Sequence, residues 1–262
     1  MPNSALQVAR TGLEAQDTRM RVIAHNLANI GTTGFKRDRA DFETLSYDDA
    51  RVAGQRSGGE TAYAIGLNLG TGVAVQGTTR IETQGTLATT GNSLDMALDG
   101  DGFFRIELPG GQTGYTRAGN FTRSAEGQLV TAQGYALQPG ITVPAGAQSI
   151  AVGPDGTVTA IIDGQAEPAE LGQITVASFV NPAGLQATGG NLLLETAASG
   201  AAEEGIPGTE GRGTIRQGML EQSNVNVVEE LVEMIAAQRA YEINSKMISA
   251  VDEMLRNANQ TL

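Results

Sequence analysis

Two apolar repeats with a period of seven residues, one at each end of the chain, constrain its fold most strongly. The N-terminal line consists of Leu6, Leu13, Met20 and Leu27, and the C-terminal line consists of Val227, Met234, Tyr241, Ile248 and Leu255. A sustained period of seven without proline is typical of long helices that pack on other helices. We therefore expect helices over residues 5–30 and 227–255 that form a coiled-coil-like pair.

The C-terminal repeat carries more apolar lines than one partner helix can cover. Two further lines also repeat at seven: Ala236, Ile243 and Ala250, and Ala240, Met247 and Met254. A helix with one neighbour needs only one apolar stripe. Two interpretations remain: a helical hairpin that lies on the rest of the chain, or helices that meet neighbouring subunits. The extra lines favour neighbouring subunits.

Between the two repeats the pattern changes to short apolar runs separated by turn residues, and most of the 35 glycines lie there. Hairpin loops are predicted at residues 124–127 and 153–156. Gly31 is expected as the left-handed cap that ends the first helix. The sequence thus predicts an α+β chain in three parts. They are a helical assembly domain of residues 1–36 and 217–262, an extended connecting arm at 37–72, and a Gly-rich all-β domain at 73–216.

Several functional classes are disfavoured by composition. A net charge of −12 without a basic patch argues against a nucleic-acid partner. The chain has no cysteine, and His25 is its only histidine. Asp99 and Asp101 are spaced as in a calcium loop, but Phe103 stands where a third oxygen ligand is needed.

The GxSxG, GxGxxG and P-loop patterns are also absent from the sequence. No apolar run is long enough to span a membrane, and the N-terminus has no cleavable secretion signal. We therefore expect no enzymatic activity, no cofactor and no metal. A soluble secreted β protein with a helical hairpin, acting in binding or hydrolysis, is the alternative to a polymerising subunit.

Three segments resemble the flagellar rod and hook family. They are NLAN and TGFK within residues 26–36, GDGFF and YTRAGNF within residues 100–121 together with residues 127–134, and QGMLEQSNVNVVEELVEMIAAQRAYEINSK at residues 217–246. The resemblance thins over residues 48–63 and 161–211, and the family usually has Asn where this chain has Gly31. The chain length, the SNVNVVEE run and the LNLGTGV segment at 67–73 favour the distal rod over the proximal rod and the hook.

The resemblance implies a structural subunit that is exported unfolded, without a cleaved signal, and polymerises helically into a hollow periplasmic rod. The implied partners are further copies of the chain, proximal rod proteins, the hook protein, the P and L ring proteins and the rod cap. The terminal helices would line the inner tube, and the β domain would face outward. The residues expected at the assembly surface are Leu6, Leu13, Met20, Ile23, Asn26, Leu27, Asn29, Gly34, Phe35, Val227, Leu231, Met234, Tyr241, Met247, Ile248 and Leu255.

Overall fold

The computed structural model describes residues 2–51, 54, 56, 63–163 and 167–260. By its internal contacts the chain divides into two compact units. The first, here called the helical unit, comprises Met1–Ala28, Asp38–Thr79 and Asn226–Leu262. The second, here called the β unit, comprises Asn29–Arg37 and Arg80–Val225. The predicted α+β class with terminal helices and a β-rich middle is confirmed.

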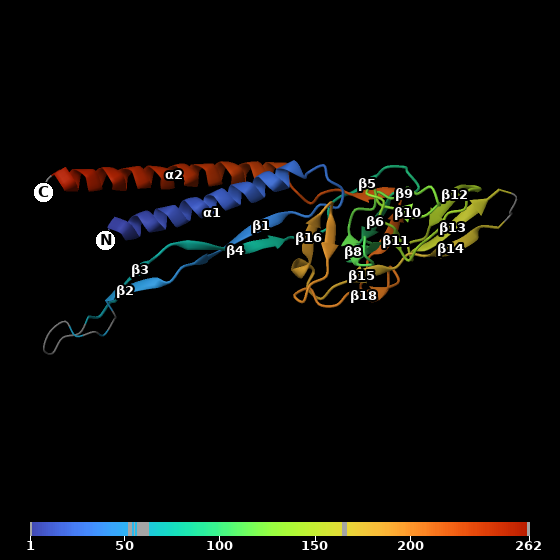
Figure 1. Ribbon diagram of the computed structural model, residues 1–262, viewed down its shortest axis with the longest axis horizontal. Coiled ribbons are helices and arrows are strands. Elements are labelled where there is room, and N and C mark those ends of the chain that lie inside the picture. Colours follow the sequence, from blue (N-terminus) through green and yellow to red (C-terminus); the bar gives the residue numbers. More distant parts are fainter. Residues whose placement is uncertain (1, 52–53, 55, 57–62, 164–166, 261–262) are drawn as a thin grey trace. The chain divides into compact units, whose positions relative to one another are not determined.

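Two helices form the main part of the helical unit. Helix α1 (Pro2–Ala28) and helix α2 (Val227–Gln260) lie side by side and run in opposite directions (Figure 1). Asn226 caps α2, since its Oδ1 accepts a hydrogen bond from the Val228 amide at 3.1 Å. The predicted left-handed cap at Gly31 is wrong. Helix α1 ends at Ala28, and the first left-handed glycine after it is Gly34, with φ of 68°.

The predicted arm is a two-stranded ribbon beside α1. Strand β1 (Asp38–Thr44) pairs with β4 (Val73–Arg80), and β2 (Tyr47–Arg51) pairs with β3 (Leu67–Gly70) (Figure 1). The Val73 amide donates to Thr11 Oγ1 of α1 at 3.3 Å, which fastens the ribbon to the helix. The middle of the arm, at residues 52–53, 55 and 57–62, lies outside the described residues.

The β unit contains the remaining strands. Their bounds are β5 (Leu87–Thr89), β6 (Met96–Asp99), β7 (Phe103–Glu107), β8 (Thr113–Thr116), β9 (Thr122–Arg123), β10 (Leu129–Val130), β11 (Leu137–Gln138), β12 (Ala147–Val152), β13 (Thr157–Ile162), β14 (Ala169–Gln173), β15 (Val176–Ser178), β16 (Gln186–Gly189), β17 (Leu192–Leu194), β18 (Glu203–Gly205), β19 (Thr214–Gln217) and β20 (Met219–Glu221). A short 3-10 helix at Pro182–Gly184 precedes β16.

The largest sheet of the β unit has the order β16-β17-β8-β7-β15-β18, with β11 also paired to β7. Strands β12, β13 and β14 form a three-stranded sheet, and the other strands pair two by two. Both predicted hairpins are confirmed, since residues 124–127 lie between the paired strands β9 and β10, and residues 153–156 between β12 and β13.

Apolar side chains from these sheets form two core clusters in the β unit, a smaller one around Phe103 and Tyr115 and a main core. Its largest fully buried members include Met96, Leu98, Phe104, Ile106 and Phe121. The rings of Phe104 and Phe121 meet edge to face with centroids 5.3 Å apart. Such pairs add specific geometry to the burial of two large apolar groups. The β unit therefore has the core of an independently folded domain.

Candidate assembly surface and buried ion cluster

The contact between α1 and α2 is made largely by small and polar side chains. Asn26 Nδ2 donates to Glu230 Oε2 at 3.3 Å in a buried position, and Arg19 forms an ion pair with Glu233 at 3.4 Å. A Cβ added to Gly12 would lie 2.9 Å from Asn244 Nδ2. Within one chain, polar residues and a glycine thus take part in the contact between the two helices.

Asn26 has a second role at the end of α1. Its side chain donates to the carbonyl oxygen of Asp38 at 2.8 Å and accepts from the Asp38 amide at 2.9 Å. One amide side chain therefore satisfies both polar groups of the first residue of β1. The sequence placed Asn26 at the assembly surface, whereas its observed contacts lie within the helical unit.

The structure distributes the other predicted assembly residues over three environments. Ile23, Asn26, Gly34 and Phe35 are buried within the chain. The half-buried positions are Leu6, Leu13, Met20, Leu27, Asn29, Met234 and Ile248. The exposed positions are Val227, Leu231, Tyr241 and Met247. The side chain of Leu255 lies outside the described part of the structure.

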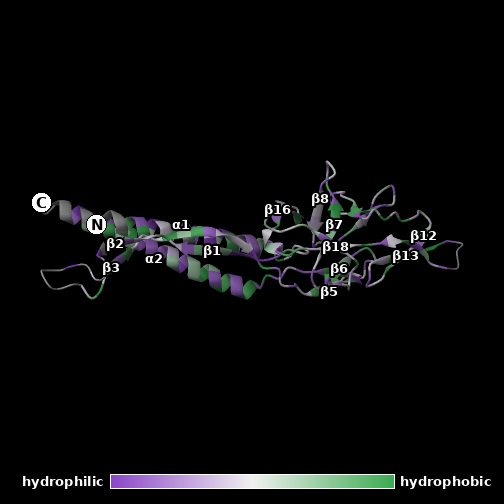
Figure 2. Ribbon diagram, turned by 90° about the horizontal axis from the view of Figure 1, so that it is seen from below, coloured by the Kyte–Doolittle hydropathy of each residue, from purple (hydrophilic) through white to green (hydrophobic). Residues whose placement is uncertain are grey.

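Helix α2 carries a large apolar surface that no described residue covers. Its six members, here called the uncovered face, are between 44% and 69% exposed: Val228, Val232, Ile235, Ile243, Met247 and Met254. Figure 2 shows hydrophobic positions along the ribbon of α2. Contiguous exposed apolar surface of this kind marks an interaction site, because leaving it in water is unfavourable.

Within the β unit, charged residues from separate segments form a buried ion cluster. Lys36 Nζ lies 2.7 Å from Glu221 Oε1, and Arg117 Nε lies 3.7 Å from Glu221 Oε2. The Gly85 amide donates to Glu221 Oε1 at 2.9 Å. The side chains of Lys36, Arg117 and Glu221 are at most 5% exposed. The two cations therefore surround a carboxylate that water does not reach.

Burial governs the protonation of this cluster. It lowers the pKa of Lys36, although the hydrogen bond to Glu221 and the Glu221 charge oppose the change. Burial also raises the pKa of the nearby Glu82 carboxyl, and the positive charges of Arg80, Lys36 and Arg117 oppose that rise. Both shifts have desolvation as their largest cause, as expected for charged groups with limited access to water.

Around the cluster, backbone segments approach one another closely at glycine residues. Gly34 is left-handed, and a Cβ there would lie 2.7 Å from backbone atoms of Arg117 and Ala118. A Cβ at Gly85 would collide with the carbonyl oxygen of Gln222. The glycine of the TGFK motif thus permits the contact with the YTRAGNF motif.

Sequence reasoning did not select Lys36, Arg117, Glu221 or Asn224 as functional residues. Each is a polar or charged residue whose local sequence does not distinguish it from a surface residue. The sequence feature that could have identified them is their position, because each lies inside one of the three segments that resemble the rod and hook family.

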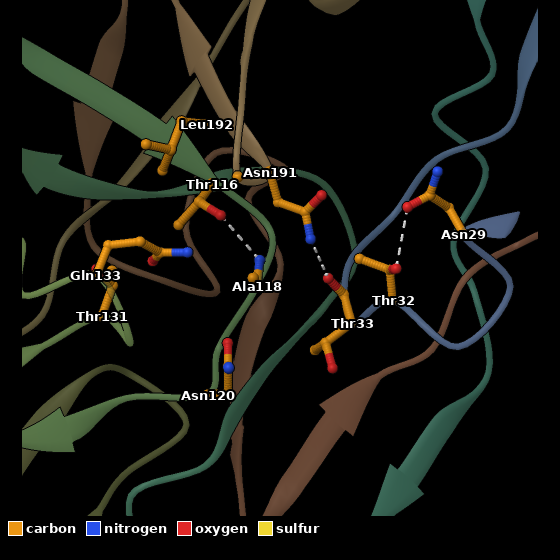
Figure 3. Close-up of a pocket in the computed structure, with 11 residues that line it drawn as sticks. Asn29, Thr32, Thr33, Thr116, Ala118, Asn120, Thr131, Gln133, Asn191 and Leu192 are labelled. Atoms are coloured by element: carbon orange, nitrogen blue, oxygen red, sulfur yellow. Dashed lines mark hydrogen bonds between the residues drawn. The ribbon is translucent and has the colours of Figure 1, made fainter. Parts of the chain in front are cut away.

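A polar pocket of about 320 Å³ also lies within the β unit (Figure 3). Asn191 Nδ2 donates to the Thr33 carbonyl oxygen at 2.8 Å, and Thr32 Oγ1 donates to Asn29 Oδ1 at 3.1 Å. Its lining contains amide and hydroxyl groups, including those of Asn120 and Gln133, but no charged residue. The first bond holds the turn after α1 against the residue that precedes β17, and the second lies within that turn.

The described residues contain no group of three or more His, Asp or Glu that could hold a metal ion. Asp99, one of the two spaced aspartates, pairs with Arg216 at 3.1 Å. No helix in the described part of the chain is long and apolar enough to cross a membrane.

Comparison with known protein families gives three matches along the chain. Residues 6–36 match the family described as flagella basal body rod protein. Residues 97–160 match the D1 domain of flagellar hook protein FlgE/F/G, and residues 216–261 match the C-terminal part of flagellar basal body rod FlgEFG protein. None of these families is described as catalytic.

Full-length relatives agree with these matches. The flagellar basal-body rod protein FlgG of Buchnera aphidicola subsp. Acyrthosiphon pisum is 48% identical over 256 residues, which cover 98% of each chain. FlgG of Caulobacter vibrioides is 46% identical over 257 residues, again 98% of each chain. The flagellar basal-body rod protein FlgF of the same organism is 35% identical over 260 residues, or 96% of each chain.

Proposed function

This chain belongs to the flagellar basal-body rod protein family, in which it is a structural rod subunit, and we propose that it polymerises helically into the distal rod through its terminal helices. The chain is 46% identical to FlgG of Caulobacter vibrioides but 35% identical to FlgF of the same organism. This difference favours the FlgG-like place in the rod. Because its relatives are basal-body rod proteins, the protein is located in the flagellar basal body.

The uncovered face of α2 is the observation that carries the assembly proposal. Full burial of one Val, Ile or Met side chain contributes about 1.5–3 kcal/mol. The six residues are 44–69% exposed, so covering them contributes part of this value for each and can drive association. The occupant is a second copy of the chain, whose own terminal helices offer apolar lines with the same period. A contact between two different faces builds an open helical filament when the rotation between neighbouring copies does not close a ring.

The test substitutes Ile243, which is 61% exposed and contributes to the uncovered face. Ile243→Asp places a carboxylate where the proposal requires an apolar contact, and we expect it to abolish polymerisation. Gln238→Asp is the matched control, because it adds the same charge to an exposed polar position of α2. Sedimentation as a function of concentration measures assembly, and the thermal unfolding of the β unit reports on its integrity.

Polymerisation of Ile243→Asp at wild-type concentrations would show that the uncovered face is not the interface. Loss of assembly in both variants would show a general effect of charge on α2. A stable monomer at high concentration of the wild type would instead support the rival interpretation, a soluble secreted β protein.

The remaining expectations about assembly belong to the same proposal. Leu6, Leu13, Met20 and Leu27 of α1 are half-buried, which leaves part of each side chain for a neighbouring copy. Ile248 is also half-buried, so Ile248→Asp would disturb the α1–α2 contact as well as assembly. The exposed apolar residues Leu67 and Leu69 of β3 give the arm an edge that can pack on a neighbour.

The proposed partners are proximal rod proteins, the hook protein, the P and L ring proteins and the rod cap, in addition to other copies of the chain. The subunit is proposed to reach the periplasm unfolded and without a cleaved signal. Its terminal helices would line a hollow tube, with the all-β domain outside. Family membership supports these points, and isolation of basal bodies with antibodies against the β unit would test the location.

A further inference from the structure

Three segments that are distant in the sequence are joined around the buried ion cluster. They are residues 33–37, 81–86 and 221–224. The Arg37 amide donates to Asn224 Oδ1 at 2.7 Å, and Asn224 Nδ2 donates to the Ile81 carbonyl oxygen at 2.8 Å. Lys36 Nζ donates to the Thr83 carbonyl oxygen at 2.8 Å. Each segment is therefore hydrogen-bonded to the other two.

All three segments adjoin, in sequence, the places where the chain passes from one unit to the other. These passages follow Ala28, Arg37, Thr79 and Val225. The ion cluster itself lies wholly within the β unit. It thus fastens together the ends of the β unit at which the chain enters and leaves.

The energetics of the cluster indicate that it selects one arrangement of the three segments more than it adds to the free energy of unfolding. Moving Lys36 and Glu221 out of water is costly, and their attraction offsets this cost only in part. Among the described residues, Glu221 Oε2 and Arg117 Nη1 have no hydrogen-bond partner. Separating the pair would leave a buried charge alone, which is far less favourable than the paired state. Alternative pairings of the three segments are therefore strongly disfavoured.

We propose that Lys36 and Glu221 form a closure lock, which completes this end of the β unit only when the N-terminal turn and the C-terminal strand are both in place. The two residues are 185 positions apart, so a chain that lacks either end cannot close the lock. Lys36 and Glu221 are positioning residues, because they hold the backbone of three segments in register.

The consequence for assembly rests on the proposed function. A subunit that travels unfolded closes the lock only after the segment around Glu221 has emerged with the N-terminal turn. The β unit then takes its final form at the site of assembly and not earlier. The lock itself is a property of the isolated chain and is testable without polymerisation.

Hydrogen exchange of the full-length monomer tests the lock. Glu221→Gln keeps the shape and the acceptor oxygen of the side chain but removes the charge that pairs with Lys36. We expect exchange about tenfold faster or more at four backbone amides whose acceptors are not the Glu221 side chain. They are the amides of Gly34, Arg37, Ile81 and Gln222, which donate to Glu221 O, Asn224 Oδ1, Arg37 O and Thr86 O. The amides of β7 in the core should keep their protection.

The matched control is Glu204→Gln, which removes another ion pair of the β unit. Glu204 Oε1 lies 2.7 Å from Arg105 Nη2, and its side chain is 50% exposed. We expect no change at the four lock amides in this variant. Faster exchange confined to Gly85, the amide that binds the Glu221 carboxylate, would overturn the proposal, because the pair would then act only locally.

A second measurement needs no substitution, and it decides the question if Glu221→Gln does not fold. Exchange of the wild type in increasing urea below the unfolding transition should bring the four amides to one common opening reaction. That opening should be easier than the opening of β7. The proposal would be overturned if the four amides exchanged through four unrelated opening reactions, or if they opened only together with the core.

Discussion

The helical unit and the β unit bury very different side chains. The β unit buries Phe104, Phe121, Met96 and other large residues in its main core. Among the described residues of the helical unit, the buried apolar side chains are Ala9, Ala15, Ile23, Ala237 and Val251. Most of these are small, while the larger apolar residues of α2 remain exposed.

This difference indicates that the β unit is complete within one chain and that the helical unit is not. Hydrophobic stabilisation scales with the apolar area removed from water, so alanines contribute little. In proteins, most of the stability of a helix comes from tertiary packing of its apolar face. We therefore expect the helical unit to gain stability from contacts outside the chain, as the proposed assembly through the terminal helices requires.

The largest effect is expected from Phe104→Ala in the core of the β unit. Phe104 is fully buried and packs edge to face on Phe121. Its truncation leaves a cavity and should lower the free energy of unfolding by about 3–5 kcal/mol. Urea titration of the monomer measures the loss. A loss below about 1 kcal/mol would mean that the β unit lacks a specifically packed core.

A smaller loss, about 2–3 kcal/mol, is expected from Gly34→Ala. The left-handed backbone at Gly34 and the short distance to Arg117 and Ala118 both disfavour a Cβ. Gly31→Ala is the control, because a Cβ there meets no atom within 4 Å. Thermal unfolding of the two variants should differ clearly. Equal melting temperatures would contradict the assignment of Gly34 as the residue that requires glycine.

An intermediate effect that depends on pH is expected at Glu82. Because burial raises the pKa of Glu82, its stability contribution is fully present below the unfolded value near 4.5 and is lost as pH rises through the folded pKa. The groups facing it are Lys36, Arg80, Arg117 and Glu221.

Glu82→Gln should therefore be more stable than the wild type at pH 7 and similar to it near pH 4. Urea midpoints of both proteins at the two pH values measure the difference. A variant that is less stable at pH 7 would show that the ionised carboxylate stabilises the cluster, which would contradict the expected gain in the free energy of unfolding.

The smallest effect is expected from Gly12→Ala in the helical unit. Alanine favours the helix by about 1 kcal/mol over glycine. The new Cβ would meet Asn244 Nδ2, the movable end of a side chain, so we expect a gain of about 0.5–1 kcal/mol. Circular dichroism at 222 nm follows the melting of the helices. A clear loss of helicity would show that α1 and α2 need the close contact at Gly12, and would weaken the contrast between the units.

Local sequence patterns predicted the elements of this protein better than their contacts. The seven-residue repeats located both terminal helices, and turn residues located the hairpins between β9 and β10 and between β12 and β13. Periodicity reports which side of an element is apolar. It does not report what covers that side, and the α1–α2 contact includes Gly12 and Asn26, which lie outside the apolar lines.

The sequence by itself determined the α+β class, the two terminal helices and, through its resemblance, membership of the rod family. These properties follow from spacing and composition, which are local along the chain. Tertiary structure alone decided that Gly34, and not Gly31, is left-handed and that Lys36, Arg117 and Glu221 meet in the interior. Their burial depends on segments up to 185 residues apart, and no local pattern encodes such a separation.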